Sequence, residues 1–178
     1  MPIRFNLQQY HSQGSVFIET GLWKCQGVEK ALLAGFERVI SIEISPKILQ
    51  AGQKRLAKHI SSGRVSLLLG DSARLMETAL SMVPDSRIVF WLDGHYQGVG
   101  AYAENPLYSE LCAIGRHSRS DHTVLIDDRR LFSRPTWGVD ESRVKNMLLG
   151  FNPQYRFCCL RGHVPNDVLC AYVTRQDV

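Results

Sequence analysis

The stretch VFIETGLWKCQG, residues 16–27, has the layout of a strand that runs into a glycine-bearing loop. Val16–Thr20 is β-branched and aromatic and too short for a helix, which favours a buried strand. Glu19 lies near the end of this strand, and Gly21 and Gly27 lie in the loop. Such a layout presents backbone N–H groups and one carboxylate to a small polar ligand. Its glycine spacing differs from the strict dinucleotide fingerprint, so the rest of the chain must supply the other parts of a site.

Further apolar runs of strand length follow this stretch, at residues 38–44, 65–69, 87–92 and 122–126. Apolar residues at helical spacing predict helices at residues 28–36, 46–59, 73–82, 106–114 and 139–149. Apolar strands that alternate with helices indicate a parallel sheet covered on both faces. Two last strands, 155–160 and 168–174, flank a turn-rich loop and predict an antiparallel hairpin. We therefore expect an α/β, doubly wound, Rossmann-like sheet of seven strands, in the order 3-2-1-4-5-7-6 with strand 7 antiparallel.

The length of 178 residues suits a single domain over residues 1–178, with residues 1–15 as a polar lead-in. The net charge of +4 is mild and does not indicate nucleic-acid binding. No apolar run approaches the roughly 20 residues of a membrane span, and the first residues lack the apolar core of a secretory signal. The five cysteines form no C-x-x-C pair, so we expect reduced, buried thiols, no zinc site and a cytoplasmic protein.

Acidic residues follow the predicted parallel strands at the point where each strand ends. They are Glu19, Glu43, Asp71, Asp93, Asp127 and Asp128. Ligands of open α/β sheets bind outside the carboxyl ends of the strands where the strand order reverses, which here lies between strands 1 and 4. Acids gathered at one edge repel one another unless they bind cations, hydroxyls or amines. The alternative is that each acid only caps the helix that follows it.

The acids nearest the glycine loop match the groups of one ligand. Glu43 lies 22 residues after Gly21, at the spacing typical of a carboxylate that binds two ribose hydroxyls. Asp71, followed by Ser72, is placed to accept from an adenine amino group. Glu19 is placed to hold a ligand ammonium, whereas a pyrophosphate would favour a loop without a carboxylate. The combination favours S-adenosylmethionine over a dinucleotide.

The pieces ETGLWKCQG, VISIEISP, LLLGDS, WLDGHY and VLIDD occur in this order within residues 16–130. In them the sequence resembles the class I S-adenosylmethionine-dependent methyltransferase superfamily. LDGHY followed by IDD also resembles the small metal-assisted O-methyltransferases of that superfamily. The resemblance implies these cofactor-binding residues: Glu19, Gly21 and Gly27 at the methionine part, Glu43 at the ribose, Asp71 and Ser72 at the adenine, and Asp93 at the next strand end.

The first loop departs from the superfamily's common E-x-G-x-G-x-G. Trp23, Lys24 and Cys25 stand where small residues are usual. Side chains at these positions limit how closely the loop backbone can approach a cofactor. The alternatives to a methyltransferase are therefore a similar protein that binds a ligand without methyl transfer, or an enzyme that uses S-adenosylmethionine in another reaction.

Asp93, Asp127 and Asp128 come from two adjacent strand ends and form an oxygen-rich set suited to Mg²⁺ or another divalent cation. Such an ion would lower the pKa of a substrate hydroxyl and orient it toward the methyl group. His95 is an alternative general base or a further ligand, and a structural hydrogen bond is its simplest role. For Asp128 the alternative is an ion pair with one of the two arginines that follow it.

We therefore expect an enzyme that transfers a methyl group from S-adenosylmethionine to a small-molecule oxygen nucleophile, with Asp93 and His95 as catalytic residues. The loop at residues 96–105 is rich in glycine and alanine and is a candidate lid beside Asp93. Little material precedes the first strand to enclose an acceptor. Either the acceptor is large, or a second subunit completes the pocket, as in a homodimer.

Overall fold

The structure is a computed structural model that describes residues 3–11, 14–94, 105–132 and 134–174. Its strands are β1 Val16–Thr20, β2 Arg38–Glu43, β3 Val65–Leu69, β4 Ile88–Leu92, β5 Thr123–Ile126, β6 Arg156–Leu160 and β7 Val168–Tyr172. Its α-helices are α1 Gln8–His11, α2 Gln26–Leu33, α3 Pro46–Arg55, α4 Ala57–Ser61, α5 Ser72–Ser81, α6 Leu107–Gly115 and α7 Glu141–Phe151. Two 3₁₀ turns, η1 Arg129–Leu131 and η2 Pro135–Trp137, follow β5.

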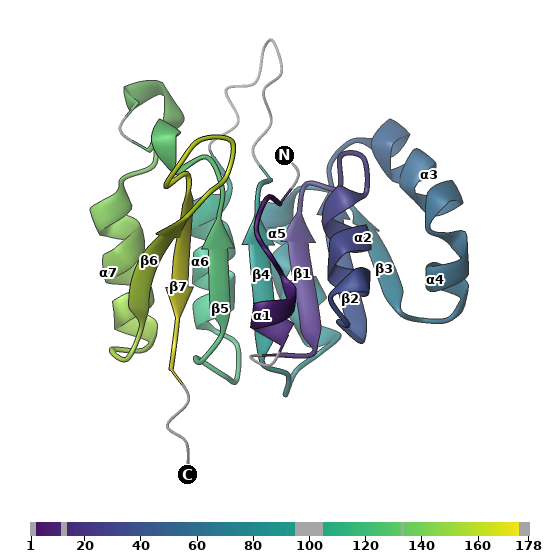
Figure 1. The fold of residues 1–178 in the computed structure, drawn as a ribbon, viewed down its shortest axis with the longest axis horizontal. Helices are drawn as coiled ribbons and strands as arrows, with labels where there is room; N and C mark the ends of the chain where they lie inside the picture. Colours follow the sequence, from purple (N-terminus) through teal and green to yellow (C-terminus); the bar gives the residue numbers. More distant parts are fainter. Residues whose placement is uncertain (1–2, 12–13, 95–104, 133, 175–178) are drawn as a thin grey trace.

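The strands form one sheet in the order β3-β2-β1-β4-β5-β7-β6 (Figure 1). The five strands β3, β2, β1, β4 and β5 are parallel, and β7 runs antiparallel to both β5 and β6. Helices lie on both faces of the sheet (Figure 1). The predicted fold class, strand order and antiparallel β7 are confirmed.

Side chains of the central strands alternate between two apolar cores, one on each face of the sheet. Ile18 and Phe90 belong to the core that includes residues of α5, α6 and α7. Phe17 and Val89 belong to the other core, which includes residues of α2. Because side chains point alternately to the two faces, a strand buried on both faces must be apolar throughout. This requirement explains the continuous apolar runs of the sequence and leaves polar residues for the strand ends.

The segment before β1 packs into the molecule more closely than its expected polar character suggests. Ile3, Leu7 and Tyr10 are buried in the core on the α2 face, and α1 carries Tyr10. Ile3 and Leu7 lie before this short helix, so most of the buried segment reaches the core without helical structure. Within the described residues, no helix combines the length and the apolar character needed to cross a membrane.

Helix α2 begins and ends earlier than the predicted 28–36, and two other helices depart from prediction for reasons that the structure shows. The single helix expected at residues 46–59 is divided into α3 and α4 at Leu56, whose backbone leaves the helical region with φ −99° and ψ 11°. Helix α7 continues through Gly150 to Phe151, whereas Gly150 was expected to end it. The Phe151 ring fills the space beside Gly115 of α6, so packing between the two helices favours the two additional residues.

The cysteines are all free, as expected, but only two of them are buried. Cys25 and Cys170 are buried, whereas Cys112 and Cys158 are exposed. The expectation of buried thiols is wrong for the exposed pair because Cys158 lies on the edge strand β6 and Cys112 on an exposed position of α6. Apolar neighbours in the sequence do not distinguish an edge strand from a central one.

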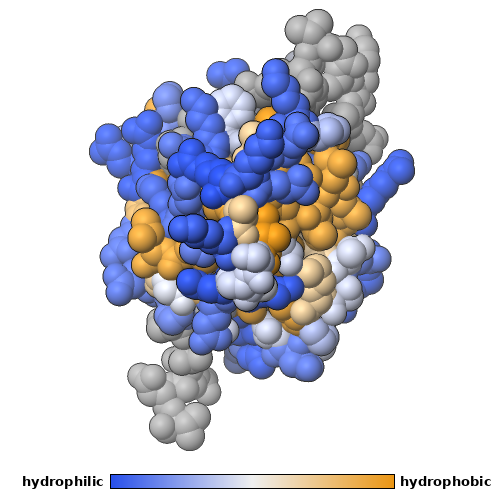
Figure 2. Space-filling model, turned by 90° about the vertical axis from the view of Figure 1, so that its right-hand side faces the viewer, coloured by the Kyte–Doolittle hydropathy of each residue, from blue (hydrophilic) through white to orange (hydrophobic). Residues whose placement is uncertain are grey.

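The opposite edge of the sheet is formed by β3 and is rich in leucine. Leu67 and Leu68 are partly buried and Leu69 is exposed. Figure 2 shows apolar side chains gathered on the side of the molecule that carries β3, α3 and α4. The exposed end of β3 lies next to the end of β2, where the predicted ligand residues begin.

Candidate ligand site at the carboxyl edge of the sheet

The structure brings the predicted site residues to the edge at which the strand order reverses. Strand β1 pairs with β2 on one side and with β4 on the other. Backbone hydrogen bonds continue beyond the strand ends, from Gly21 N to Ile42 O at 2.8 Å and from Asp127 N to Leu92 O at 3.1 Å. These bonds hold the loops after β1 and β5 against the neighbouring strands. The edge is therefore a fixed platform at the place where open α/β sheets bind ligands.

Glu43 holds the loop that follows β1. Its Oε2 accepts hydrogen bonds from the backbone N–H groups of Leu22 at 3.0 Å and Trp23 at 3.3 Å. Its Oε1 accepts from the N–H of Ser45 at 2.8 Å. Its carboxyl group collects three backbone N–H groups, two from the loop after β1 and one from the residue before α3. Glu43 thus ties the ends of β1 and β2 together, beside its predicted role at a ribose.

Gly21 and Gly27 are needed for close contacts at this edge. Gly21 has a φ of +88°, and a Cβ built on it would lie 2.7 Å from the backbone oxygen of Asp93. A Cβ on Gly27 would lie 1.8 Å from Glu19 Oε2. Both distances are far below contact distance, so a larger residue at either position requires the neighbouring strand end or carboxylate to move.

The non-glycine residues of the loop adopt conformations that glycine favours. Trp23 has a φ of 46° and Cys25 a φ of 62°, both in the left-handed region. Each such residue costs about 1–2 kcal/mol, which the packing of its surroundings must offset. Leu22 and Cys25 are buried, whereas Trp23 is 59% exposed. The loop therefore keeps a compact turn by anchoring Leu22 and Cys25 inside and directing Trp23 to the solvent.

Glu19 is a buried acid at the centre of the edge. Only 1% of the residue is exposed to solvent. Its Oε1 accepts a hydrogen bond from Ser41 Oγ at 2.8 Å. Burial raises the pKa of Glu19 to about 8; the Ser41 hydrogen bond opposes the rise, and the charge of Asp93 adds to it. At neutral pH this carboxyl is therefore mostly protonated in the free protein. A ligand ammonium beside it would favour the ionised form.

Asp71 caps the helix that follows β3. Its Oδ1 accepts from the N–H of Ala73 at 2.9 Å, and Ser72 is buried. The helix-capping alternative is therefore observed for Asp71, whose side chain remains exposed to a ligand. Two apolar residues that the sequence analysis did not single out, Ile44 and Leu69, are each 51% exposed near the ends of β2 and β3. They offer an apolar surface of the kind on which a flat ring can lie.

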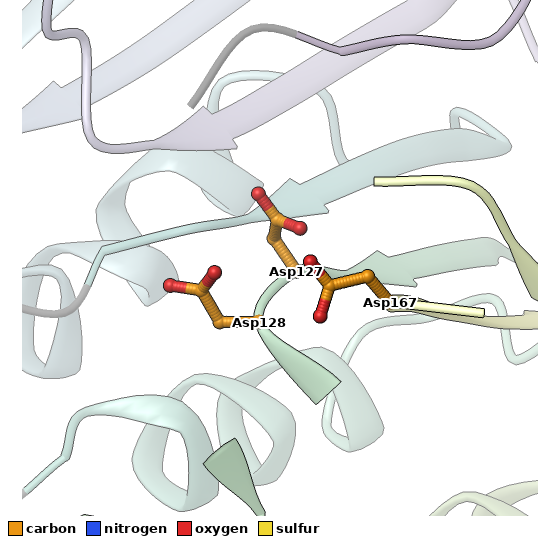
Figure 3. A group of neighbouring side chains, drawn as sticks. All are labelled: Asp127, Asp128 and Asp167. Atoms are coloured by element: carbon orange, nitrogen blue, oxygen red, sulfur yellow. The ribbon is translucent and has the colours of Figure 1, made fainter. Parts of the chain in front are cut away.

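Beyond β5 the structure gathers three buried acids (Figure 3). Asp127, Asp128 and Asp167 each place one carboxylate oxygen within 4.8 Å of the others. Asp127 and Asp128 were predicted as metal ligands, and Asp167, which directly precedes β7, was not. Asp93 lies outside this group of three. Burial raises the pKa of Asp127 to about 7, and the charge of Asp93 contributes to the rise, so Asp93 lies nearby.

Arg130 lies between two of these acids. Its Nη1 forms ion pairs with Asp128 Oδ1 at 2.6 Å and with Asp167 Oδ2. Asp167 also accepts from the backbone N–H of Arg130 at 3.2 Å and from that of His163 at 3.1 Å. The ion-pair alternative considered for Asp128 is thus the arrangement that the structure shows.

A small cavity opens beside Asp127. Its enclosed space is about that of one water molecule, and the wall that it exposes is more polar than apolar. The lining residues are Leu92, Gly94, Asn105, Pro106, Leu107, Glu110, Ile126, Asp127, Phe132 and Trp137. Glu110, a buried acid of α6, was missed by the sequence analysis, although an acid within an apolar helical stretch could have indicated it. His95 and residues 96–104 of the predicted lid lie outside the described residues.

Comparisons with known proteins give matches in structure but not in sequence. No protein-family model matches the sequence. No curated protein matches it either. Among solved structures, the O-methyltransferase TomG from Streptomyces achromogenes, in complex with SAM, superimposes with a TM-score of 0.65 at 16% identity, over 95% of this chain and 78% of the other.

Two further structures match to a similar extent. An O-methyltransferase from Bacillus cereus in complex with SAH has a TM-score of 0.65 at 15% identity, over 94% of this chain and 79% of the other. A methyltransferase from Geobacter sulfurreducens has a TM-score of 0.62 at 15% identity, over 95% of this chain and 76% of the other. At these identities the likeness shows the fold, and it confirms the predicted resemblance at the level of the fold.

Proposed function

We propose that this protein transfers a methyl group from S-adenosylmethionine to the oxygen of a small-molecule acceptor. The observation that carries the proposal is the pair of acids around the glycine loop. Glu19 and Glu43 lie at the ends of β1 and β2, at the position where the strand order reverses. TomG and the Bacillus cereus O-methyltransferase, which share this fold, were solved with SAM and SAH.

The residues at the edge fit the methionine end of the cofactor. Gly21 lets the backbone of Asp93 approach the loop, and Gly27, in the first turn of α2, lets the Glu19 carboxyl group approach the helix. Glu19 is buried with one hydrogen bond from a neutral hydroxyl, and an ammonium would supply the positive charge that its ionised form needs. We assign Glu19, Gly21 and Gly27 to this end of the cofactor, beside Asp93.

The ends of β2 and β3 fit the nucleoside. Glu43 receives three backbone N–H groups and retains acceptor capacity for ribose hydroxyls, since an ionised carboxylate offers about four lone-pair sites. Ile44 and Leu69 provide apolar surface for the base, and Asp71 with Ser72 provides polar groups for its amino group. When bound, S-adenosylmethionine supplies an electrophilic methyl group on a positively charged sulfur.

The cavity beside Asp127 is the proposed acceptor pocket. Phe132 and Trp137 give it aromatic walls, and Glu110 and Asp127 give it two carboxyl groups that can accept hydrogen bonds from a hydroxyl. The cavity has room for about one water molecule, so an acceptor would have to part its walls on binding. Methyl transfer needs mainly alignment and a deprotonated acceptor, so few catalytic side chains are required. Asp93 and His95 remain the proposed catalytic residues.

A divalent cation at Asp93, Asp127 and Asp128 does not fit the arrangement as it stands. The ion pair between Arg130 and Asp128 already occupies one of the three carboxylates. We therefore derive no catalytic step through a metal ion. A homodimer and a cytoplasmic location stay predictions of the sequence.

The proposal is tested by calorimetric titration with S-adenosylmethionine and S-adenosylhomocysteine, followed by product analysis with small phenols and catechols. Glu43→Gln should weaken binding of both ligands, because the amide nitrogen that replaces one carboxylate oxygen donates hydrogen bonds and cannot accept them. Glu37→Gln, which changes an exposed acid before β2, is the matched control and should bind normally. Binding without methyl transfer to any acceptor would favour the ligand-binding alternative, and no heat with either ligand would exclude the proposal.

A further inference from the structure

We infer that the guanidinium of Arg130, rather than a divalent metal ion, is the cation that pairs with Asp128 and Asp167 in the acidic group Asp127, Asp128 and Asp167. The inference rests on ion pairs and hydrogen bonds of this group. It goes beyond the proposed function and holds whether or not methyl transfer is found. Arg130 is in this view a positioning residue that fixes Asp128 and Asp167, next to Asp127 in the wall of the proposed acceptor pocket.

The acidic group requires a cation because its members are buried and close together. Asp127, Asp128 and Asp167 are 4%, 2% and 0% exposed, and their nearest oxygens lie within 4.8 Å of one another. Like charges at such distances, away from water, disfavour ionisation unless an opposite charge compensates them. A protein can supply that charge either as a bound metal ion or as a side chain.

Arg130 occupies the space that a metal ion would need. Its Nη1 lies 2.6 Å from Asp128 Oδ1 and also contacts Asp167 Oδ2. Mg²⁺ and Ca²⁺ bind carboxylate oxygens at about 2.0–2.6 Å, which is the same range. A metal ion that bridged Asp128 and Asp167 would therefore overlap the guanidinium. The two carboxylates cannot serve both cations at once.

Both carboxylate oxygens of Asp167 already accept hydrogen bonds from other groups of the protein. Its Oδ1 accepts from the backbone N–H of Arg130, and its Oδ2 accepts from the N–H of His163 as well as from the guanidinium. These donors satisfy both oxygens in directions set by the chain. A metal ion would have to break several charge-assisted hydrogen bonds to gain this ligand.

The local backbone places Arg130 in this position. Asp128 takes a left-handed conformation with a φ of 58° immediately before η1. The N–H of Arg129 then donates to Asp167 O at 2.7 Å, which joins η1 to the residue that precedes β7. The left-handed backbone of Asp128 and the hydrogen bond from Arg129 to Asp167 turn the chain so that the side chain of Arg130 meets both carboxylates. Left-handed non-glycine residues are maintained where the surroundings determine them in this way.

The inference is tested by titrating the protein, dialysed against EDTA, with Mn²⁺ and following free Mn²⁺ by electron paramagnetic resonance. The wild type should show no bound Mn²⁺ up to about 1 mM. Arg130→Met should bind one Mn²⁺ with a dissociation constant below about 100 μM, at least about tenfold below the limit set for the wild type. Adding Asp128→Asn to this variant should remove the binding. Arg134→Met, which changes an exposed arginine near the same turn, should behave as the wild type.

Two results would overturn the inference. One is a wild type that binds a single Mn²⁺ with a dissociation constant below about 1 mM and loses this binding in Asp128→Asn. The other is a folded Arg130→Met, by circular dichroism, that binds no Mn²⁺. If Arg130→Met does not fold, the melting temperature of the wild type is measured with and without Mg²⁺ instead. The inference predicts no change. A rise in melting temperature that is lost in Asp128→Asn would contradict the inference. None of these measurements depends on methyl transfer.

Discussion

Burial of Glu19 should couple cofactor binding to the release of a proton. The pKa of this carboxyl is raised to about 8 in the free protein, mainly by burial. A ligand ammonium needs the ionised form, so binding must remove the proton that the carboxyl carries below this pKa. The affinity for S-adenosylhomocysteine should therefore rise with pH until the pKa of Glu19 is reached.

The size of the effect follows from the pKa. With a pKa of about 8, roughly nine-tenths of the Glu19 side chains are protonated at pH 7 and nearly all at pH 6. Ionising the group before binding then costs about 1.4 kcal/mol at pH 7 and about 2.7 kcal/mol at pH 6. The dissociation constant should fall about tenfold between pH 6 and pH 7, with release of about 0.9 proton at pH 7.

Calorimetric titrations in buffers with different ionisation enthalpies measure both quantities. The slope of the observed enthalpy against the buffer enthalpy gives the number of protons released. Glu19→Gln should bind weakly and show no such slope, whereas Glu37→Gln should behave as the wild type. An affinity that is equal at pH 6 and pH 7, with no proton released, would refute the assignment of Glu19 to the ammonium.

Three further predictions concern buried groups. The folded-state pKa of Glu19 is raised from 4.5 to about 8, so its ionisation opposes folding as the pH rises through this range. Glu19→Gln should therefore raise the free energy of unfolding, measured in urea at pH 8, by a few kcal/mol. An unchanged free energy of unfolding would contradict this prediction. Gly27→Ala should abolish binding of S-adenosylhomocysteine, while Gly150→Ala, with open space around it, should not; equal affinities would show that the contact with Glu19 is unimportant. Burial and the neighbouring His117 lower the pKa of His122 to about 3. The stability that the neutral His122 contributes is therefore lost as the pH falls below about 6.5, by about 2 kcal/mol at pH 5. His122→Phe should remove this part of the acid sensitivity, and a pH profile of stability identical to that of the wild type would disprove the prediction.

The fold could be predicted because its signals are local and repeated. The central parallel strands are buried on both faces and are therefore apolar along most of their length, as residues 88–92 illustrate. The closing hairpin is marked by a turn composition between two strands. The division at Leu56 and the buried segment before β1 were missed because they depend on packing against distant elements.

The acidic group shows where sequence reasoning stops. Asp127 and Asp128 could be found because they end a strand, but Asp167 lies in a turn and meets them only through the pairing of β5 with β7. Arg129 and Arg130 were both recognised as possible ion-pair partners of Asp128 from their place in the sequence, and the structure pairs Arg130 with it. That its Nη1 bridges two carboxylates depends on the left-handed backbone of Asp128, which sequence patterns do not reveal for a non-glycine residue.

The first loop shows the same limit. Trp23, Lys24 and Cys25 depart from the small residues expected there, and their effect depends on their conformation. The structure gives Trp23 and Cys25 the left-handed backbone that glycine favours, with Cys25 buried and Trp23 exposed. The departure in sequence is therefore compatible with a compact loop beside Glu19.

The most direct measurement is the titration of the wild-type protein with S-adenosylhomocysteine by calorimetry at pH 7.5. If the edge around Glu19 and Glu43 is a cofactor site, the titration should show binding of one ligand per chain, weakened in Glu43→Gln and retained in Glu37→Gln. The absence of any binding heat at millimolar ligand, confirmed by an unchanged melting temperature, would contradict the account.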